Sequence, residues 1–259
     1  MTLPRRRLGR TGLEVSALGL GAANLGGVYG EVDERTAIAT VHRAFDLGVT
    51  LFDASPYYGD TRAETVLGKA LATLPRDGYV LSTKAGRYGR DEFDFTPARL
   101  CRSLEESLRR LGVERVDLFL LHDVEFGDLD FVLRESLPAM RALALSGKVG
   151  HVGLTGLPLT VFRRALAATA NAGDDTGLEV VLSYCHATLF DAGLLALLPE
   201  LTARGIGVLN ASAAAMGLLC NAGPRDWHPA GAAIRAACAA AAAHCRARGV
   251  ELAELALSF

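Results

Sequence analysis

Residues 96–123, TPARLCRSLEESLRRLGVERVDLFLLHD, combine the signals of a helix with those of the strand that follows it. Thr96 followed by Pro97 is typical of a helix N-terminus, because threonine caps the first turn and proline needs no hydrogen-bond partner there. Leucines spaced three and four apart then predict a helix with one buried face: Leu100, Leu104, Leu108 and Leu111. Gly112 suits the left-handed end of that helix. The nearly unbroken apolar run Val116–His122 predicts a strand covered on both faces.

The same alternation of strand and helix runs along the chain. Seven segments have the apolar character of strands and begin roughly 30 residues apart, the length of one strand-helix unit of a barrel: Ala17–Leu20, Thr50–Asp53, Tyr79–Lys84, Val116–His122, Gly150–Thr155, Glu179–Tyr184 and Gly207–Ala211. Further helical patterns follow Asp33 (Ile38, Val41 and Phe45) and Asp191 (Leu194, Leu198 and Leu201), with Gly147 and Gly205 at predicted helix ends. No linker interrupts the pattern. The sequence therefore predicts one α/β domain over residues 1–259, a (β/α)8 TIM barrel.

The expected eighth strand is missing from this pattern. The last two segments, Gly231–Gly249 and Val250–Phe259, have the composition of helices. A barrel that lacks one strand has two open edges with unpaired backbone groups. Either the barrel is truncated before its eighth strand or another element closes the gap, and we expect the truncated barrel.

Composition excludes several classes of protein. Of 259 residues, 50% are hydrophobic, and 27 Lys and Arg against 29 Asp and Glu give a net charge of −2. This balance argues against nucleic acid or an anionic membrane as a partner. The five cysteines are widely spaced without a CxxC pair, so neither a disulfide framework nor a metal site is expected. The N-terminus has no apolar signal segment, and we expect a cytoplasmic protein.

Polar side chains gather where the predicted strands end. Asp53 and Tyr58 follow the second strand, Lys84 ends the third and His122 ends the fourth. In a parallel barrel these carboxyl ends meet at one rim, where active sites are built. An ammonium beside a phenol favours the phenolate and lowers its pKa, and a neutral histidine can polarise a carbonyl. The four side chains can handle the proton of a hydride transfer, whereas the hydride requires a nicotinamide cofactor.

These motifs resemble the aldo-keto reductase superfamily over essentially the whole chain. The matching pieces are the N-terminal Arg7–Ser16 with Leu18-Gly19-Leu20-Gly21, the DxxxxYG motif Asp53–Gly59, Ser82-Thr83-Lys84 and Leu120-Leu121-His122. The segments Leu182–His186, Asn210–Leu219 and Gly223–Pro229 are most similar to the L-galactose dehydrogenases and related aldose dehydrogenases of that superfamily. The resemblance implies NAD(P)-dependent oxidation of the C1 hydroxyl of an aldose such as L-galactose to the lactone, with NAD favoured over NADP.

The resemblance also implies roles for individual residues. Tyr58 would be the general acid/base, Lys84 would tune its pKa, Asp53 would hold Lys84, and His122 would orient the substrate. The cofactor-binding residues would be Gly21, Ala22, Asp53, Thr155, Ser183, Ser212, Ala213, Ala214, Met216, Gly217 and Leu218, and the substrate would contact Tyr58, His122 and Trp227. Thr155-Gly156 stands where the family commonly has Ser-Asn or Ser-Arg, Ser183 where Gln is common, and Ala211 where many members stack an aromatic ring on the nicotinamide.

Alternatives stay open at this point. The chain could be an NADPH-dependent aldehyde or carbonyl reductase, or a non-catalytic cofactor-binding barrel. The expected partner is a small sugar or aldehyde, and we expect a monomer or a weak homo-oligomer. His186 is a further candidate for the sugar pocket, while strand alternation predicts that Cys185 faces the core and is inert. Trp227 either covers the substrate mouth or plugs the barrel rim.

Overall fold

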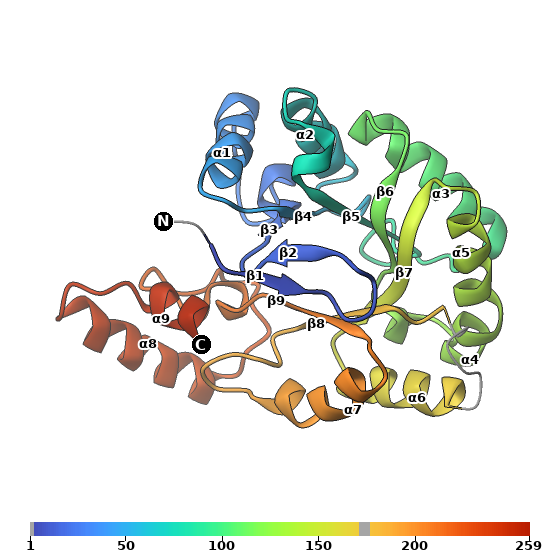
Figure 1. The fold of residues 1–259 in the computed structure, drawn as a ribbon. Helices are drawn as coiled ribbons and strands as arrows, with labels where there is room; N and C mark the ends of the chain where they lie inside the picture. The colour runs from blue at the N-terminus through green and yellow to red at the C-terminus, as the bar shows by residue number, and fades with distance from the viewer. Residues whose placement is uncertain (1–2, 171–176) are drawn as a thin grey trace. The chain divides into compact units, whose positions relative to one another are not determined.

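A computed structural model describes residues 3–170 and 177–259 of the chain (Figure 1). Its centre is a sheet of seven parallel strands in the order β3-β4-β5-β6-β7-β8-β9, an α/β barrel arrangement. The strands are β3 (Leu20–Gly21), β4 (Leu51–Asp53), β5 (Val80–Ala85), β6 (Val116–Leu121), β7 (Val149–Gly156), β8 (Val180–Tyr184) and β9 (Gly207–Ala211). The strand order equals the chain order, which confirms the predicted barrel topology. After β9 the described chain forms only helices.

Helices lie between successive strands, and the last two follow β9. They are α1 (Glu34–Asp46), α2 (Arg62–Leu71), α3 (Pro97–Leu111), α4 (Leu129–Phe131), α5 (Leu137–Ala144), α6 (Leu159–Thr169), α7 (Leu198–Ala203), α8 (Ala232–Arg246) and α9 (Leu252–Ser258). Short 3-10 turns are η1 (Ala22–Gly26), η2 (Arg76–Gly78), η3 (Val124–Phe126), η5 (Gly193–Ala196) and η6 (Ala215–Gly217), and η4 (Val132–Ser136) is a π-helical turn. None of the helices in the described ranges is long and apolar enough to cross a membrane.

The helix-strand unit that predicted the fold is present as expected. In α3, the Thr96 side chain accepts a hydrogen bond from the Arg99 N–H, and Gly112 ends the helix in the left-handed conformation. Every residue of the following strand, β6, is buried. The Thr96 cap and the regularly spaced leucines therefore predicted α3 correctly from local sequence. Burial of β6 on both faces agrees with its nearly unbroken apolar sequence.

Two predicted boundaries were wrong. The first barrel strand covers only Leu20–Gly21 instead of Ala17–Leu20. The helix expected after Asp191 is split into η5 and α7, and α7 begins one residue before Pro199. Proline lacks the N–H that a helix interior needs but suits a first turn, so it starts a new helix there.

An antiparallel hairpin of β1 (Arg5–Arg7) and β2 (Glu14–Ser16) precedes the barrel strands. All three arginines of β1 are exposed, as expected for a solvated strand. Between the two strands, Leu8 is buried and the Arg10 N–H donates to the Gly205 carbonyl at 2.7 Å. The hairpin is thus fastened to the segment that leads into β9.

The described contacts divide the chain into two compact units. The first comprises residues 1–182 and 201–208, and the second comprises residues 183–200 and 209–259. In the first unit, helices α3 and α5 pack on strands β5 and β7, and Phe52, Phe119 and Phe162 are fully buried. The prediction of a single domain over residues 1–259 stays a prediction.

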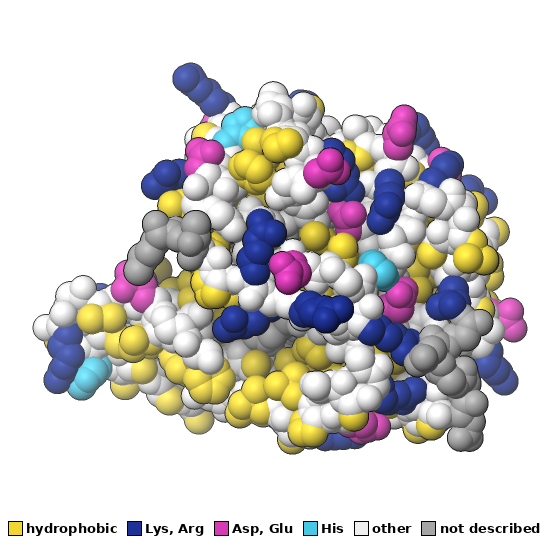
Figure 2. Space-filling model, viewed as in Figure 1, with side chains coloured by type: hydrophobic (Ala, Val, Ile, Leu, Met, Phe, Trp, Pro, Cys, Tyr) yellow, Lys and Arg dark blue, Asp and Glu magenta, His cyan; other side chains and the backbone are white. Residues whose placement is uncertain are grey.

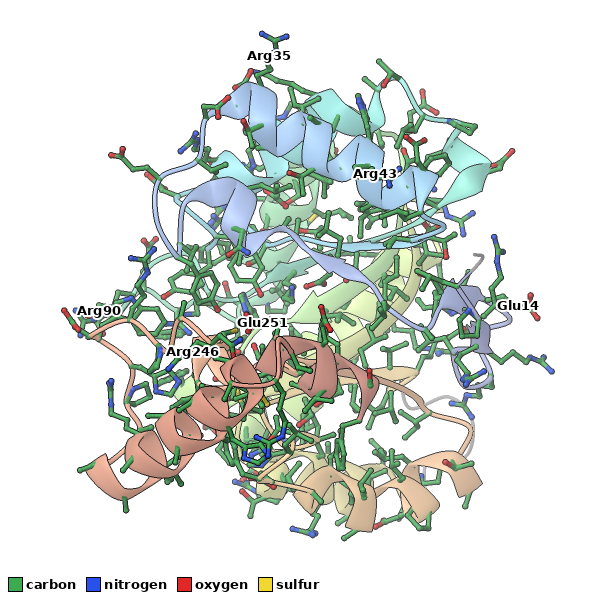
Figure 3. All side chains as sticks on the ribbon, turned by 90° about the vertical axis from the view of Figure 1, so that its left-hand side faces the viewer. Glu14, Arg35, Arg43, Arg90, Arg246 and Glu251 are labelled. Atoms are coloured by element: carbon green, nitrogen blue, oxygen red, sulfur yellow. The ribbon has the colours of Figure 1, made fainter. Side chains whose placement is uncertain are left out.

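The second unit has its own small apolar core. Its buried members are Ala215, Leu218, Leu219, Cys238, Ala242, Cys245, Leu252 and Ala256, from η6, α8 and α9. Asn221 joins the helices to the preceding loop, because its N–H donates to Glu251 Oε1 and its side-chain amide donates to the Val250 carbonyl. Figure 3 shows Arg246 at the end of α8 close to Glu251 at the start of α9.

The surface carries both signs of charge. Figure 2 shows basic and acidic side chains interspersed over the face in view, with apolar side chains between them. This mixture is what a net charge of −2 from 27 basic and 29 acidic residues leads one to expect.

Candidate functional site

Three neighbouring strands carry the predicted polar side chains to one edge of the sheet. In the parallel register Asp53 of β4 pairs with Ser82 of β5, and Lys84 of β5 pairs with Leu120 of β6. His122 follows β6 directly, and its N–H donates to the Ala85 carbonyl at 2.8 Å. The carboxyl ends of β4, β5 and β6 therefore present their side chains side by side, at the rim where barrel enzymes build their sites.

Lys84 is held by two partners inside the barrel. Its Nζ lies 2.5 Å from Asp53 Oδ2 and donates to the Ala54 carbonyl at 2.8 Å. The Ser82 hydroxyl donates to the other Asp53 oxygen at 2.7 Å. The Lys84 side chain is 1% exposed and that of Asp53 16%. Burial alone would lower the pKa of Lys84, but Asp53 and Tyr58 raise it above its ordinary value, so the ammonium stays charged.

Tyr58 packs against this charged pair. Lys84 Nζ lies 4.8 Å from the centre of the Tyr58 ring, and the Tyr58 and His122 rings meet edge to face with centres 5.5 Å apart. The loop that carries Tyr58 turns at Gly59, whose φ is 61°. A Cβ at Gly59 would lie 2.0 Å from the Gly26 carbonyl oxygen. Glycine is therefore required at Gly59, both for its left-handed backbone and for the close approach of η1.

The pKa of Tyr58 corrects the sequence prediction. We expected Lys84 to lower it, and Lys84 does act in that direction, but burial has the larger effect and raises the pKa of Tyr58 to about 12. Desolvation disfavours the phenolate more than one nearby ammonium favours it. At neutral pH Tyr58 is therefore a protonated phenol, a proton donor beside the Lys84 ammonium.

His122 is buried and neutral, as predicted. Burial, followed by the cations Lys84 and Arg87, lowers its pKa to about 3 against the opposing effect of Asp123. Its Nδ1 lies 2.8 Å from Ser55 Oγ, which accepts a hydrogen bond from the Tyr57 N–H at 3.2 Å. The Ser55 hydrogen is thereby free to bond to Nδ1. We assign the tautomer with hydrogen on Nε2 on this basis, which makes Nε2 a donor.

Three further residues of this edge were given no role from the sequence: Ser55, Arg87 and Asp123. Asp123 Oδ2 accepts a hydrogen bond from Arg87 Nη1 at 2.5 Å, and the Asp123 N–H donates to Thr155 Oγ1 at 2.9 Å. The position of Asp123 directly after His122 is a signal that could have been used. Arg87 lies in a loop with no motif, so only the structure reveals it.

The predicted cofactor residues of the first unit occupy different environments. Gly21 ends β3 beside Asp53 in the parallel register, and a Cβ at Gly21 would meet nothing within 4 Å. Ala22 is fully buried. The Thr155 hydroxyl contacts both the backbone and the carboxylate of Asp123. The open space at Gly21 suits the approach of a ligand to the backbone.

The remaining predicted residues belong to the second unit. Ser183 is fully buried, and its Oγ has no hydrogen-bond partner within the described ranges. The predicted segment Ser212, Ala213, Ala214, Met216, Gly217 and Leu218 surrounds η6. Ser212, Ala215 and Met216 have φ values of 59°, 47° and 52°. Such strained backbone in non-glycine residues is concentrated at ligand-binding loops.

Strand alternation failed at Cys185. Its φ is 65°, so the extended backbone stops at Tyr184 and the face of Cys185 cannot be counted from the strand. Cys185 is half-buried, and burial raises the pKa of its thiol to about 11, which agrees with an inert cysteine. His186 Nδ1 lies 2.8 Å from Asp191 Oδ2. Trp227 is 53% exposed and stacks on His228 with ring centres 6.2 Å apart.

Comparison with known proteins decides the family. The model of the aldo/keto reductase family matches residues 17–259. The chain belongs to this family. It is 47% identical over 256 residues to L-galactose dehydrogenase of Arabidopsis thaliana, which covers 98% of this chain and 79% of the relative. It is 34% identical over 253 residues to D-arabinose 1-dehydrogenase of Saccharomyces cerevisiae, covering 95% of this chain and 75% of that protein.

Solved structures agree with this assignment. A glycerol dehydrogenase of Gluconobacter oxydans matches with a TM-score of 0.74 at 25% identity, covering 97% of this chain and 81% of that one. A putative aldo-keto reductase from Pseudomonas aeruginosa matches with a TM-score of 0.69 at 32% identity, covering 82% and 79%. This aldo/keto reductase is therefore an oxidoreductase with the barrel of its family.

Aldo/keto reductases use NAD(P)H, and the described residues fit such a cofactor. In the first unit the space beside Gly21 is open. In the second unit the buried Ser183 Oγ has no hydrogen-bond partner within the described ranges. Its hydroxyl can therefore donate to the oxygen of a bound amide or accept from its N–H. The left-handed backbone around η6 is suited to holding an anion. Each of these features is of a kind that a nicotinamide dinucleotide requires.

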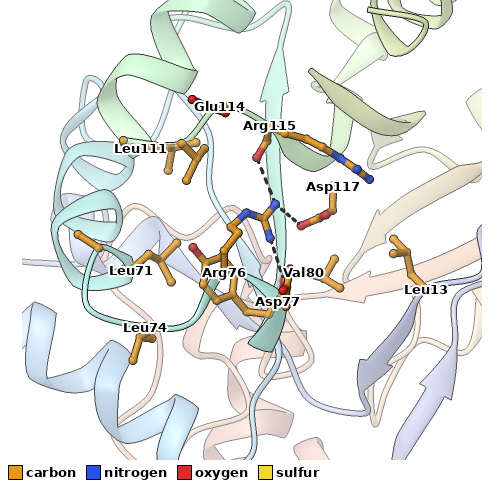
Figure 4. Close-up of a pocket in the computed structure, with 14 residues that line it drawn as sticks. Leu13, Leu71, Leu74, Arg76, Asp77, Val80, Leu111, Glu114, Arg115 and Asp117 are labelled. Carbon is orange, nitrogen blue, oxygen red and sulfur yellow. Dashed lines mark hydrogen bonds and ion pairs between the residues drawn. The ribbon is translucent and has the colours of Figure 1, made fainter. Parts of the chain in front are cut away.

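A cavity of about 660 Å³ in the first unit lies elsewhere (Figure 4). Its lining includes Val80 and Asp117, which belong to the amino-terminal halves of β5 and β6. Arg76 bridges it by donating to the Tyr79 and Arg115 carbonyls and to Asp117. In such barrels the residues at the amino-terminal ends of the strands usually serve stability, whereas the active site lies at the carboxyl-terminal ends. The candidate site is therefore the edge formed by Asp53, Lys84 and His122.

Proposed function

We propose that this aldo/keto reductase oxidises the C1 hydroxyl of a cyclic aldose such as L-galactose to the lactone, with NAD as the preferred cofactor. The observation that carries the chemistry is the Tyr58 phenol lying over the Lys84 ammonium, which is itself paired with Asp53. The sugar class is supported by relatives named L-galactose dehydrogenase, D-arabinose 1-dehydrogenase and D-threo-aldose 1-dehydrogenase.

In this proposal the four side chains manage the proton and the orientation of the sugar. Tyr58 takes the proton from the C1 hydroxyl as the C–H bond breaks, and Lys84 stabilises the phenolate that accepts it. Asp53 fixes the ammonium in place. His122 donates its Nε2 hydrogen to a sugar oxygen and so orients the ring. The oxidised nicotinamide, when bound, supplies the acceptor for the hydride.

The cofactor-binding residues that we propose are those that the sequence resemblance implies: Gly21, Ala22, Asp53, Thr155, Ser183, Ser212, Ala213, Ala214, Met216, Gly217 and Leu218. Trp227, exposed in the second unit, is the proposed further contact of the substrate. The preference for NAD over NADP follows the resemblance to aldose dehydrogenases.

The reverse reaction is the second candidate. A phenol with a pKa of about 12 is protonated at neutral pH and is ready to donate to the oxygen of a carbonyl. This observation favours reduction of a small aldehyde with NADPH by the same four residues. Direction would then be set by cofactor and substrate concentrations, since an acid in one direction is a base in the other.

We propose a cytoplasmic protein that acts as a monomer or a weak homo-oligomer. The five cysteines are all free, which is usual in reducing compartments. The expected partners are small sugars or aldehydes, the substrate class of the family.

The test compares initial rates with L-galactose plus NAD and with a small aldehyde plus NADPH. The proposal expects the first pair to be faster and expects no reaction with methyl L-galactoside, whose C1 hydroxyl is blocked. Faster aldehyde reduction would favour the second candidate. Saturable binding of NADH without turnover on any sugar or aldehyde would contradict both and favour a non-catalytic barrel.

A further inference from the structure

A buried carboxylate faces the candidate histidine. Asp123 is 4% exposed, and its backbone, with φ of 52° and ψ of 58°, is left-handed. This turn brings Asp123 Oδ2 to 3.7 Å from His122 Nε2. A carboxylate so close to an imidazole in a buried setting favours the protonated, charged ring. Burial of the ring opposes this effect most strongly, and the neighbouring cations oppose it further.

Arg87 is one of these cations, and it also binds the Asp123 carboxylate. Its Nη1 lies 2.5 Å from the same oxygen, Asp123 Oδ2. The guanidinium is stacked at 3.9 Å from the centre of the Tyr57 ring, and it lies 5.3 Å from each of the Phe93 and Phe126 rings. Aromatic faces on several sides hold a guanidinium firmly and exclude water from it. The position of Arg87 is thus determined by packing as well as by charge.

We propose that Arg87 is a positioning residue, which engages the Asp123 carboxylate so that this carboxylate does not take the Nε2 hydrogen of His122 and the hydrogen stays available to the substrate. Without this ion pair, the Asp123 carboxylate would be free to accept a hydrogen bond from the His122 ring and to stabilise a positive charge on it. The catalytic consequence rests on the proposed function. The effect of Arg87 on the pKa of His122 does not rest on the proposed function, because it can be measured in the free protein.

The charged groups that act on the His122 ring are two cations and one anion. Lys84 and Arg87 are the cations and Asp123 is the anion that act on His122, while Tyr58 and Ser55 present neutral groups to it. Burial and the two cations together hold the pKa of His122 at about 3. Removing Arg87 takes away one cation and also frees Asp123, and both changes favour proton uptake at the ring.

The test is a titration of His122 by NMR of the labelled imidazole in Arg87→Met. We expect the pKa of His122 to rise by about 1–3 on loss of the paired cation. The matched control is Arg90→Met, which removes an exposed arginine from the same loop and should leave the titration unchanged. The double variant Arg87→Met with Asp123→Asn should return the pKa toward the wild-type value, because the carboxylate that attracts the proton is then absent.

Thermal unfolding and NADH binding report whether each variant folds, and Arg87→Gln replaces Arg87→Met if the latter does not. A His122 pKa equal to wild type in a folded Arg87 variant overturns the proposal, as does an equal rise in Arg90→Met. If the wild type turns over aldoses, the acid limb of kcat/KM should move to higher pH in the Arg87 variant with KM for NAD unchanged. A wild type without turnover contradicts the proposed function alone, since the titration still decides the role of Arg87.

Discussion

Lys84 Nζ lies 2.5 Å from Asp53 Oδ2, and the Lys84 side chain is 1% exposed. An ammonium buried to this degree is stable only when a carboxylate and further acceptors surround it. The Ala54 carbonyl at 2.8 Å is one such acceptor. The pair therefore maintains a fixed positive charge beside the Tyr58 ring.

Lys84→Met should abolish most of the turnover. The variant removes the cation that partly offsets the burial of Tyr58, so the pKa of Tyr58 rises further and the phenolate becomes rarer. We expect kcat to fall by about 10²–10⁴-fold, the usual contribution of acid–base catalysis. Unfolding measurements should also show that Lys84→Met is less stable than the double variant with Asp53→Asn, because the single variant leaves a carboxylate unpaired. Equal stability of the two variants would contradict the pairing.

Oxidation should accelerate with rising pH. Because burial raises the pKa of Tyr58 to about 12, only a small fraction of the phenol is ionised at neutral pH, and that fraction grows roughly tenfold per pH unit below the pKa. The oxidation rate should therefore climb between about pH 6 and 9, whereas reduction, which uses the protonated phenol, should stay level. Stopped-flow measurement of single turnovers in both directions would check this, and a level oxidation profile would contradict it.

Much of the fold and the candidate site was predictable because the signals are local. Thr96, Pro97 and Gly112 fixed the ends of α3, and strand order placed Asp53, Lys84 and His122 on one edge. What failed depends on three-dimensional surroundings. The direction in which the Tyr58 pKa shifts depends on how deeply the ring is buried, and the spacing of residues in the sequence does not reveal this depth. Arg87 reaches Asp123 from a loop without a motif, and alternation cannot anticipate the left-handed backbone of Cys185.

Ser55→Ala should impair orientation of His122 without changing its charge. The variant removes the hydrogen bond of 2.8 Å between Ser55 Oγ and His122 Nδ1. The ring then loses the partner that fixes its tautomer, and we expect kcat to fall by about tenfold, an effect of roughly 1.4 kcal/mol, with the Kd for NADH unchanged. Ser146→Ala, at an exposed position, is the control. Wild-type kcat in Ser55→Ala would argue against a role for this contact.

Gly59→Ala should destabilise the loop that carries Tyr58. Its φ of 61° costs a side chain about 1–2 kcal/mol, and the added Cβ would also collide with the Gly26 carbonyl. Gly12→Ala shares the left-handed backbone, with φ of +78°, but its Cβ would meet nothing within 4 Å. Chemical denaturation should therefore show a larger loss of unfolding free energy for Gly59→Ala than for Gly12→Ala. Equal losses would mean that η1 yields to the added methyl group.

The most direct measurement is the single-turnover rate of Tyr58→Phe with L-galactose and NAD, made beside a fluorescence titration with NADH. Removal of the phenol hydroxyl leaves the packing against Lys84 and His122 but removes the proton acceptor. We expect a rate about 10²–10⁴-fold below wild type with an unchanged Kd for NADH. A wild-type rate in Tyr58→Phe would contradict the assignment of Tyr58 as the acid/base.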